Sequence, residues 1–193
     1  MNILMDRLPS AVQIDEVAVP INTDFRVCLR IIIAMEDEEL TTQEKLSVML
    51  QLLYGNDIPA NTTSAVEMGI RFLDAISGTT NGGQQEASNE GRLYSFSHDA
   101  TYIFSAFRQS HGIDLEKEDM HWWKFVTLFM DLDSECFFCT LINLRRQRQK
   151  GKMTKEEREY YYRIRHIVDL PQSGRKLDPE EDEFMRLLQE GKN

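Results

Sequence analysis

Two cysteines, Cys136 and Cys139, form the motif whose spacing has the most direct chemical meaning. A Cys-x-x-Cys pair in the first turn of a helix can hold a thiolate for redox chemistry, and the same pair can supply half of a zinc site. Here the two intervening residues are phenylalanines in an apolar run, no second Cys-x-x-Cys exists, and the four histidines lack metal-ligand spacing. We therefore favour buried structural thiols over a redox pair or a zinc site.

Acidic residues just before this motif have the spacing that begins a calcium-binding loop. They are Asp131, Asp133 and Glu135. Such a loop needs a glycine next and a bidentate acid at its end, but Cys136 and Ile142 stand at those positions. Capping of the following helix is the better interpretation.

Two neighbouring His–Asp combinations could act as acid–base pairs, His98 with Asp99 and Asp119 with His121. No nucleophile elbow or paired-carboxylate motif accompanies them. Residues 78–91 (GTTNGGQQEASNEG) are rich in glycine but lack the Gly-x-x-x-x-Gly-Lys-Ser/Thr spacing of a phosphate-binding loop. We expect no enzyme activity, no catalytic residues, no metal and no cofactor.

Residues 145–165 are the one basic stretch in an acidic chain. They hold nine Lys/Arg residues and three Glu residues, a local charge of +6, whereas the whole chain carries −10 and the remainder therefore −16. Three consecutive tyrosines, at 160–162, lie within the stretch. Basic and aromatic residues together are typical of nucleic-acid surfaces. A solvated helix pair, or a basic face for an acidic partner, would have the same composition.

The composition bounds the class of protein. A chain of 193 residues suits one domain with a sizeable core, and its negative charge argues against a general nucleic-acid binder or a protein that lies on an anionic membrane. No apolar run approaches the roughly 20 residues that span a bilayer. The start, MNILMDRLPS, lacks the features of a signal peptide. Three cysteines, an odd number, favour a reducing cytoplasm over a disulfide framework.

The elements that must position these residues begin with a small β-hairpin. Apolar and polar residues alternate over residues 8–21, with Asp15 and Glu16 as the turn and Pro20 as a sign of an edge strand. A helix capped by Thr23 or Asp24 should follow.

Two more helices are predicted before the glycine-rich segment. A capping box of Thr41 and Glu44 should open the second helix. The third helix is predicted over residues 62–77. Its expected apolar face consists of Val66, Ile70, Leu73 and Ile76.

Residues 92–132 hold both tryptophans and five of the ten phenylalanines, so the main core should form around them. We predict two helices here, the first ending at His111-Gly112 and the second capped by Asp114. The first should carry a helical-period apolar face of Phe96, Ala100, Ile103, Phe104 and Phe107. The second should be apolar nearly all round, with Trp122, Trp123, Phe125, Val126, Phe129 and Leu132.

Three helices are predicted after residue 132. The first should start at Asp133-Ser134 and end in the basic run at 145–152, and a capping box of Thr154 and Glu157 should open the next. The last should start at Asp178-Pro179. Its apolar face would be Phe184, Leu187 and Leu188.

The predicted fold is mainly α, a helical domain of about seven to eight helices with a small N-terminal β-hairpin. Residues 1–77 should form the hairpin and three helices, and residues 78–91 a flexible linker or loop. Residues 92–170 should form the aromatic helical core and the basic helix, packed with the N-terminal part as one domain. Residues 171–193 should be a loop and a short helix.

Three short motifs are distinctive: Thr-Asp-Phe-Arg at 23–26, Phe-Arg-Gln-x-x-Gly-Ile-Asp-Leu at 107–115 and His-Trp-Trp-Lys-Phe at 121–125. Through them the chain resembles, from residue 8 to about 169, a family of small bacteriophage proteins named for the fifteenth gene product of its phage. The chain departs from the family at 15–16, where the family tends to have a glycine, and at 78–91. Both departures look like loop variation.

The resemblance implies a long-tailed phage or prophage of low-GC Gram-positive bacteria. Genes of the family lie between those for the tail tube and tape-measure proteins, the position of tail-assembly chaperones. The resemblance therefore implies a non-enzymatic chaperone or adaptor for the tape-measure protein or other tail proteins. It would work in the host bacterial cytoplasm, without a membrane partner. A homo-oligomer is compatible with this role. The alternative is a nucleic-acid-binding phage protein that uses residues 145–165.

A surface that serves this role should offer adaptable apolar side chains and complementary charge. We expect it to combine exposed parts of residues 108–124 with the basic segment. The predicted partner-binding residues are Arg108, Gln109, His111, Trp122, Lys124, Arg145, Arg146, Arg148, Tyr160 and Arg163.

Overall fold

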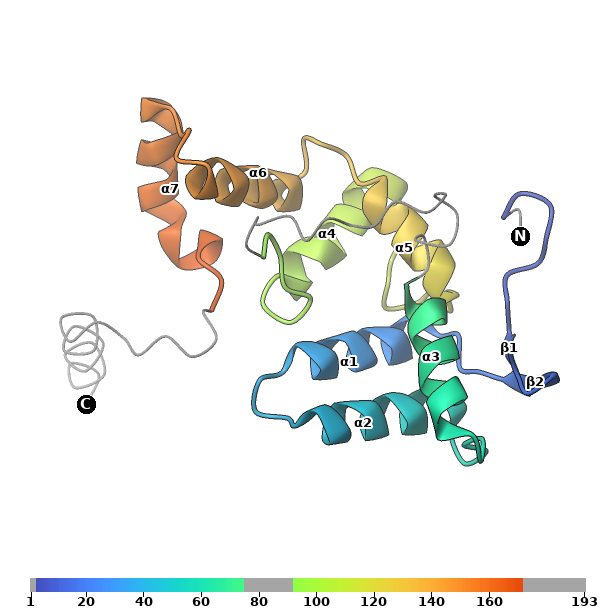
Figure 1. Cartoon of the computed structure of the whole chain (residues 1–193). Coiled ribbons are helices and arrows are strands. Elements are labelled where there is room, and N and C mark those ends of the chain that lie inside the picture. Colours follow the sequence, from blue (N-terminus) through green and yellow to red (C-terminus); the bar gives the residue numbers. More distant parts are fainter. Residues whose placement is uncertain (1–2, 75–91, 172–193) are drawn as a thin grey trace, which may run out of the picture.

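The computed structural model describes residues 3–74 and 92–171 of the chain. Within them the protein has seven helices and one N-terminal antiparallel β-hairpin, which confirms the predicted mainly α fold (Figure 1). The predicted linker at 78–91 and the predicted last helix lie outside the described residues. Among those residues no helix has the length and apolarity to cross a membrane.

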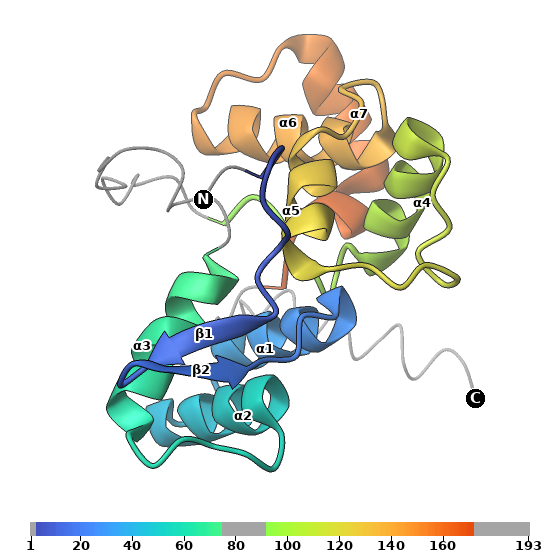
Figure 2. The same ribbon diagram turned by 90° about the vertical axis from the view of Figure 1, so that its right-hand side faces the viewer.

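The hairpin consists of β1 (Ala11–Ile14) and β2 (Val17–Pro20), with Ile14 opposite Val17. Asp15 and Glu16 both have positive φ, 48° and 66°, as a two-residue type I′ turn requires. The Asn61 side-chain amide donates to both carboxylate oxygens of Asp15 at 3.0 Å. The hairpin is thereby held against α3 (Thr62–Leu73), on which β1 packs (Figure 2).

Helices α1 (Phe25–Glu36) and α2 (Thr42–Tyr54) lie side by side and begin at predicted caps (Figures 1 and 2). The Asp24 carboxylate accepts hydrogen bonds from the first backbone N–H groups of α1. Thr41 and Glu44 form both halves of the predicted capping box.

The predicted apolar face of α3 is wrong in part. The buried residues of α3 are Ala65, Gly69 and Phe72, whereas Ile70 is 50% exposed. A Cβ at Gly69 would lie 3.0 Å from a methyl of Leu53. The small residues Ala65 and Gly69 let α3 approach α2 closely. The buried face of α3 therefore depends on small side chains as well as on hydrophobic ones. The predicted face member at position 76 lies outside the described residues.

Helix α4 (Ala100–His111) ends at the predicted glycine, because Gly112 adopts the left-handed conformation with φ 68°. Three other predictions for this region are wrong. Phe104, predicted on the apolar face, is 37% exposed. Phe96 lies in the turn before α4 and not on the helix. Helix α5 (Trp122–Met130) starts eight residues after Asp114 and is capped by His121. Asp114 instead accepts a hydrogen bond within the preceding turn, from the Glu116 backbone N–H.

The predicted core at 92–132 is confirmed by a stack of aromatic rings centred on Phe125. Its ring lies parallel to those of Phe25 in α1 and Phe107 in α4, both at 4.9 Å between centroids. Trp122 and Phe129 stack on it as well, at 5.7 and 6.1 Å. This ring therefore joins three helices from both halves of the chain.

Further contacts tie the start of α5 to the N-terminal elements. The indole N–H groups of Trp122 and Trp123 donate to the Leu73 and Phe72 carbonyls, at 2.9 and 2.8 Å. These carbonyls belong to the last turn of α3, where carbonyl groups have no hydrogen-bond partners within the helix. Both tryptophans thus cap α3 while their rings pack in the core.

Helices α6 (Phe137–Gln149) and α7 (Lys155–Val168) form a pair at one end of the molecule (Figure 1). Helix α6 is capped by Cys136, so the predicted start at Asp133-Ser134 is wrong. Thr154 opens α7 with the predicted capping box. A second apolar cluster lies between the two helices, formed by Leu141, Leu144, Tyr161 and Val168.

Candidate partner-binding surface

The Cys-x-x-Cys motif starts a helix. The Cys136 sulfur accepts a hydrogen bond from the Cys139 backbone N–H at 3.4 Å and so caps α6. Burial, with the neighbouring Cys136 sulfur, raises the pKa of Cys139 to about 11, and burial raises the pKa of Cys28 to about 12. All three cysteines are free, and Cys28 and Cys136 are buried. The thiolate is the reactive form, so this environment favours inert thiols.

The histidine rings hold backbone groups. His121 accepts the Trp123 N–H at Nδ1 and donates from Nε2 to the Pro9 carbonyl, each at 3.0 Å. His111 donates from Nε2 to the Leu128 carbonyl at 2.9 Å, which fastens the end of α4 to α5. The described residues contain no group of three or more His, Cys, Asp or Glu side chains that could hold a metal ion.

A buried ion pair between Arg145 and Asp99 joins α6 to the start of α4. The guanidinium meets the carboxylate through two hydrogen bonds, from Nη1 at 2.7 Å and Nη2 at 2.8 Å. The Arg145 and Asp99 side chains are 5% and 0% exposed. Asp99 also accepts the Ser95 backbone N–H at 3.0 Å.

The other three N–H groups of the guanidinium are also used. Nε donates to the Val168 carbonyl at 2.6 Å, Nη2 to the Ile167 carbonyl at 3.1 Å and Nη1 to the Leu93 carbonyl at 3.0 Å. All five donors of the arginine therefore have acceptors. Because two of these acceptors end α7, Arg145 fixes the position of that helix.

Two of the predicted partner-binding residues therefore lie in the interior. Arg145 is a structural ion-pair member, and Trp122, 4% exposed, belongs to the core. Sequence patterns could not identify them, because basic runs and aromatic helices look alike whether they face solvent or the interior. The pairing of Asp99 with Arg145, 46 residues away, left no local signal.

Asp169, just after α7, forms a second and more exposed polar cluster. It accepts hydrogen bonds from the Tyr161 hydroxyl at 2.8 Å and from Arg165 at 3.0 Å, and it forms an ion pair with Arg148. Burial and the bond to Asp169 raise the pKa of Tyr161. The Arg148 guanidinium also lies 4.9 Å above the Tyr161 ring. Arg148 is thus partly neutralised.

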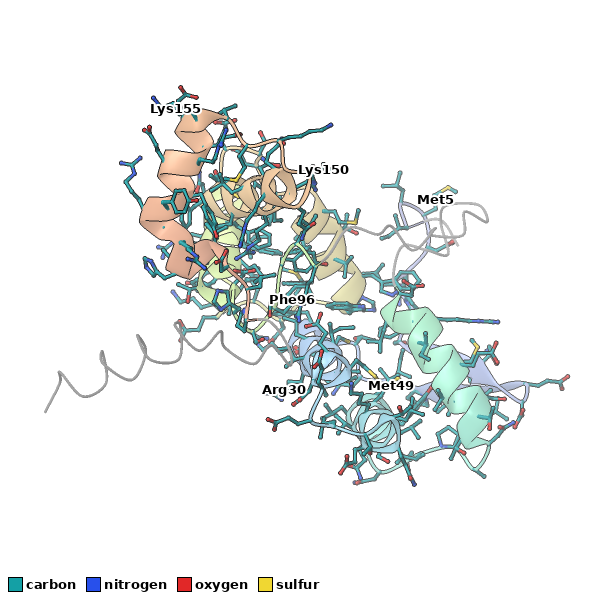
Figure 3. All side chains as sticks on the ribbon, turned by 60° about the vertical axis from the view of Figure 1, so that its left-hand side comes forward. Met5, Arg30, Met49, Phe96, Lys150 and Lys155 are labelled. Carbon is teal, nitrogen blue, oxygen red and sulfur yellow. The ribbon has the colours of Figure 1, made fainter. Side chains whose placement is uncertain are left out.

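Four other cations on or next to α7 are exposed to solvent. We define the α7 basic surface as the exposed residues Lys152, Lys155, Arg158, Tyr162 and Arg163. None of the described carboxylates pairs with these four cations, although Glu156 and Glu159 also lie on α7. Lys155 and its neighbour Lys150 stand at the end of the pair remote from α1 and α2 (Figure 3).

Aromatic rings lie among these cations. The side chain of Tyr162 is 69% exposed. The Arg163 guanidinium lies 5.5 Å above the Tyr160 ring. Of the predicted residues, Arg146 and Arg148 lie on α6, whereas Tyr160 and Arg163 lie on α7. Arg148 is already paired with Asp169.

The other predicted residues lie on α4 and α5. Arg108, Gln109 and Lys124 are exposed there, whereas His111 is half-buried. Sequence analysis missed Arg26, whose guanidinium donates to the Leu115 carbonyl at 2.8 Å. That contact explains its place in the motif at 23–26, because it clamps the turn before α5.

Comparison with known proteins relates the chain to a bacteriophage family. A family model described as Bacteriophage Gp15 protein matches residues 4–170, a range that includes both strands and all the described helices. No curated protein and no solved structure matches the chain.

Proposed function

Because the chain belongs to the bacteriophage Gp15 protein family, we propose that it is a non-enzymatic tail-assembly protein, a chaperone or adaptor for the tape-measure protein of a long-tailed phage. Family membership supports a structural or morphogenetic role in a phage. The tail position and the partner rest on the resemblance of the motifs at 23–26, 107–115 and 121–125.

The observation that carries the proposal is the α7 basic surface, on a helix whose end is held by Arg145. A chaperone for a long helical protein needs a preorganised platform with charge and adaptable apolar groups. Arg145 holds α7 in place, while Tyr162 and the cations around it remain exposed. Elsewhere the described chain exposes further apolar side chains, namely Leu4, Met5 and Met130.

Co-expression with the tape-measure protein tests the proposal. The chain should co-purify with that protein and keep it in the supernatant. Arg158→Glu with Arg163→Glu should reduce capture at least about tenfold, because two attractive charges become repulsive. A tape-measure protein that stays equally dispersed and unbound with and without this chain contradicts the proposal.

A matched control uses two exposed arginines away from α7. Arg7→Glu with Arg30→Glu changes the net charge by the same amount. Figure 3 shows Arg30 on the opposite part of the molecule from Lys155. Capture by this variant should equal that of the unchanged chain. An equal loss in both variants would assign the effect to overall charge.

Exposed cations beside Tyr162 also favour a second candidate function, nucleic-acid binding. It predicts affinity for single- or double-stranded DNA or RNA that falls steeply with salt. The charge of −16 outside residues 145–165 opposes such binding. Fluorescence anisotropy with labelled oligonucleotides in about 20 mM salt decides this, and lack of binding there eliminates the candidate.

A further inference from the structure

We propose that the acidic residues 178–190 of the same chain occupy the α7 basic surface in the free protein. A partner would then gain that surface by displacing them. The occupancy itself is independent of the proposed function, whereas the displacement step rests on it.

The receiving side of this contact is the α7 basic surface. Lys155, Arg158 and Arg163 are exposed, and no described carboxylate pairs with them. Their neighbours Arg145, Arg148 and Arg165 are already joined to Asp99 or Asp169. The local excess of positive charge is therefore concentrated on a few side chains that can accept new acidic partners.

Residues 178–190 complement the α7 basic surface in charge and in apolar side chains. Residues 178–190 contain six acids and one arginine, with five of the acids within 178–183. The helical pattern predicted from this sequence also places Phe184, Leu187 and Leu188 on one face. Exposed Tyr162, a member of the basic surface, offers an apolar contact for such a face.

The tether is long enough to join the two. Helix α7 has 14 residues and is about 21 Å long. The described chain ends at Pro171, three residues past α7. Residues 172–177 span up to about 20 Å when extended. The acids at 178–183 can therefore reach any cation along α7, including Lys155 at its far end.

Because residues 178–190 and α7 belong to one chain, weak contacts are sufficient to hold them together. Exposed ion pairs are individually weak and are screened by salt. A short tether, however, keeps the acidic residues at an effective concentration in the millimolar range. Several weak pairs and one apolar contact then compete well against a dilute external partner.

Zero-length cross-linking of the purified full chain tests the occupancy. A carbodiimide joins lysines to carboxylates in direct contact, and mass spectrometry identifies the linked residues. In low salt, Lys152 and Lys155 should link to residues 178–183 at least about fivefold more than Lys45 and Lys124 do. The links should disappear in about 0.5 M NaCl, where the Debye length falls to a few ångströms.

Two variants separate docking from mere proximity on a tether. Arg158→Gln with Arg163→Gln keeps every lysine and every carboxylate, yet it removes two cations of the surface. The links should fall at least about fivefold in this variant and remain unchanged in the control Arg7→Gln with Arg30→Gln. Equal linking of all four lysines, or no response to Arg158→Gln with Arg163→Gln, would overturn the proposal.

Mixing light and heavy isotope-labelled chains identifies the source of the acids. Links within one chain carry a single isotope, which supports the proposal. Mixed-isotope links at the statistical proportion would mean that a second copy supplies the acids, and the proposal would be wrong. No tail protein is present in this experiment, so its result is distinct from that of the co-expression test.

Discussion

At the scale of single residues, Arg145 looks like a surface residue in the sequence, but it is a buried structural residue in the fold. Its replacement by methionine leaves the buried Asp99 carboxylate without its cationic partner, so the free energy of unfolding should fall by about 3–5 kcal/mol. Urea denaturation measures this change. The neighbouring Arg146→Met should change stability by less than about 0.5 kcal/mol, and an equal loss in both variants would contradict the role assigned to the ion pair.

The thiol of Cys139 gives a pH-dependent prediction at the same scale. Its pKa rises from 9.0 to about 11 in the folded protein, which lowers the thiolate fraction at neutral pH by about 100-fold. Ellman's reagent should therefore react with Cys139 far more slowly in the native protein than in urea. Because folding favours the protonated thiol, its contribution to stability is present below pH 9 and is lost between about pH 9 and 11. Fast native labelling at pH 7 would contradict this prediction.

At the scale of elements, the β-hairpin turn holds two residues in an unfavourable conformation. Glu16 has φ 66° and lies exposed, and a left-handed conformation costs a non-glycine residue about 1–2 kcal/mol. Glu16→Gly should therefore raise the free energy of unfolding by about 1 kcal/mol, less the entropy that glycine adds to the unfolded chain. Thermal unfolding should detect the gain. Glu16→Ala serves as the control, and the prediction fails if alanine stabilises as much as glycine.

Helix starts show which element boundaries are set by residues close in sequence and which by distant contacts. The caps at Thr41 and Thr154 were predicted correctly, and Asp24 is the cap of the two predicted alternatives, Thr23 and Asp24. Each cap bonds a backbone group within three residues, which makes it visible in the sequence. Asp114 was assigned to α5 by the same reasoning, but His121 takes that place. Helix α5 starts there because the Trp122 N–H donates to the Thr23 carbonyl and the Phe25 N–H donates to the Met120 carbonyl. A local pattern cannot show such contacts.

At the scale of the whole molecule, Phe125 should couple the stability of distant helices. Its ring stacks on rings from α1 and α4, so Phe125→Ala should lower the free energy of unfolding by about 3–5 kcal/mol. Circular dichroism should follow the loss of all helices in one transition. The exposed Phe104→Ala provides a matched control with a much smaller effect. A variant that loses only α4 and α5 at low denaturant would contradict the coupling.

The sequence by itself determined the fold class, the hairpin, the helix caps at 41 and 154 and the position of the main core. These features depend on periodicity and on bonds between near neighbours, which one chain displays directly. Family membership was likewise visible in short motifs. The sequence also showed where basic charge gathers, in the segment 145–165.

Only the tertiary structure decided which of those basic and aromatic residues are exposed to solvent. Arg145 and Arg163 lie in one stretch of similar residues, yet the first is 5% exposed and the second lies in solvent. The difference comes from Asp99, which is distant in sequence and meets only one of the two. A buried charge needs a partner from elsewhere in the fold, so composition shows that charge is present, and packing decides which part of it remains free.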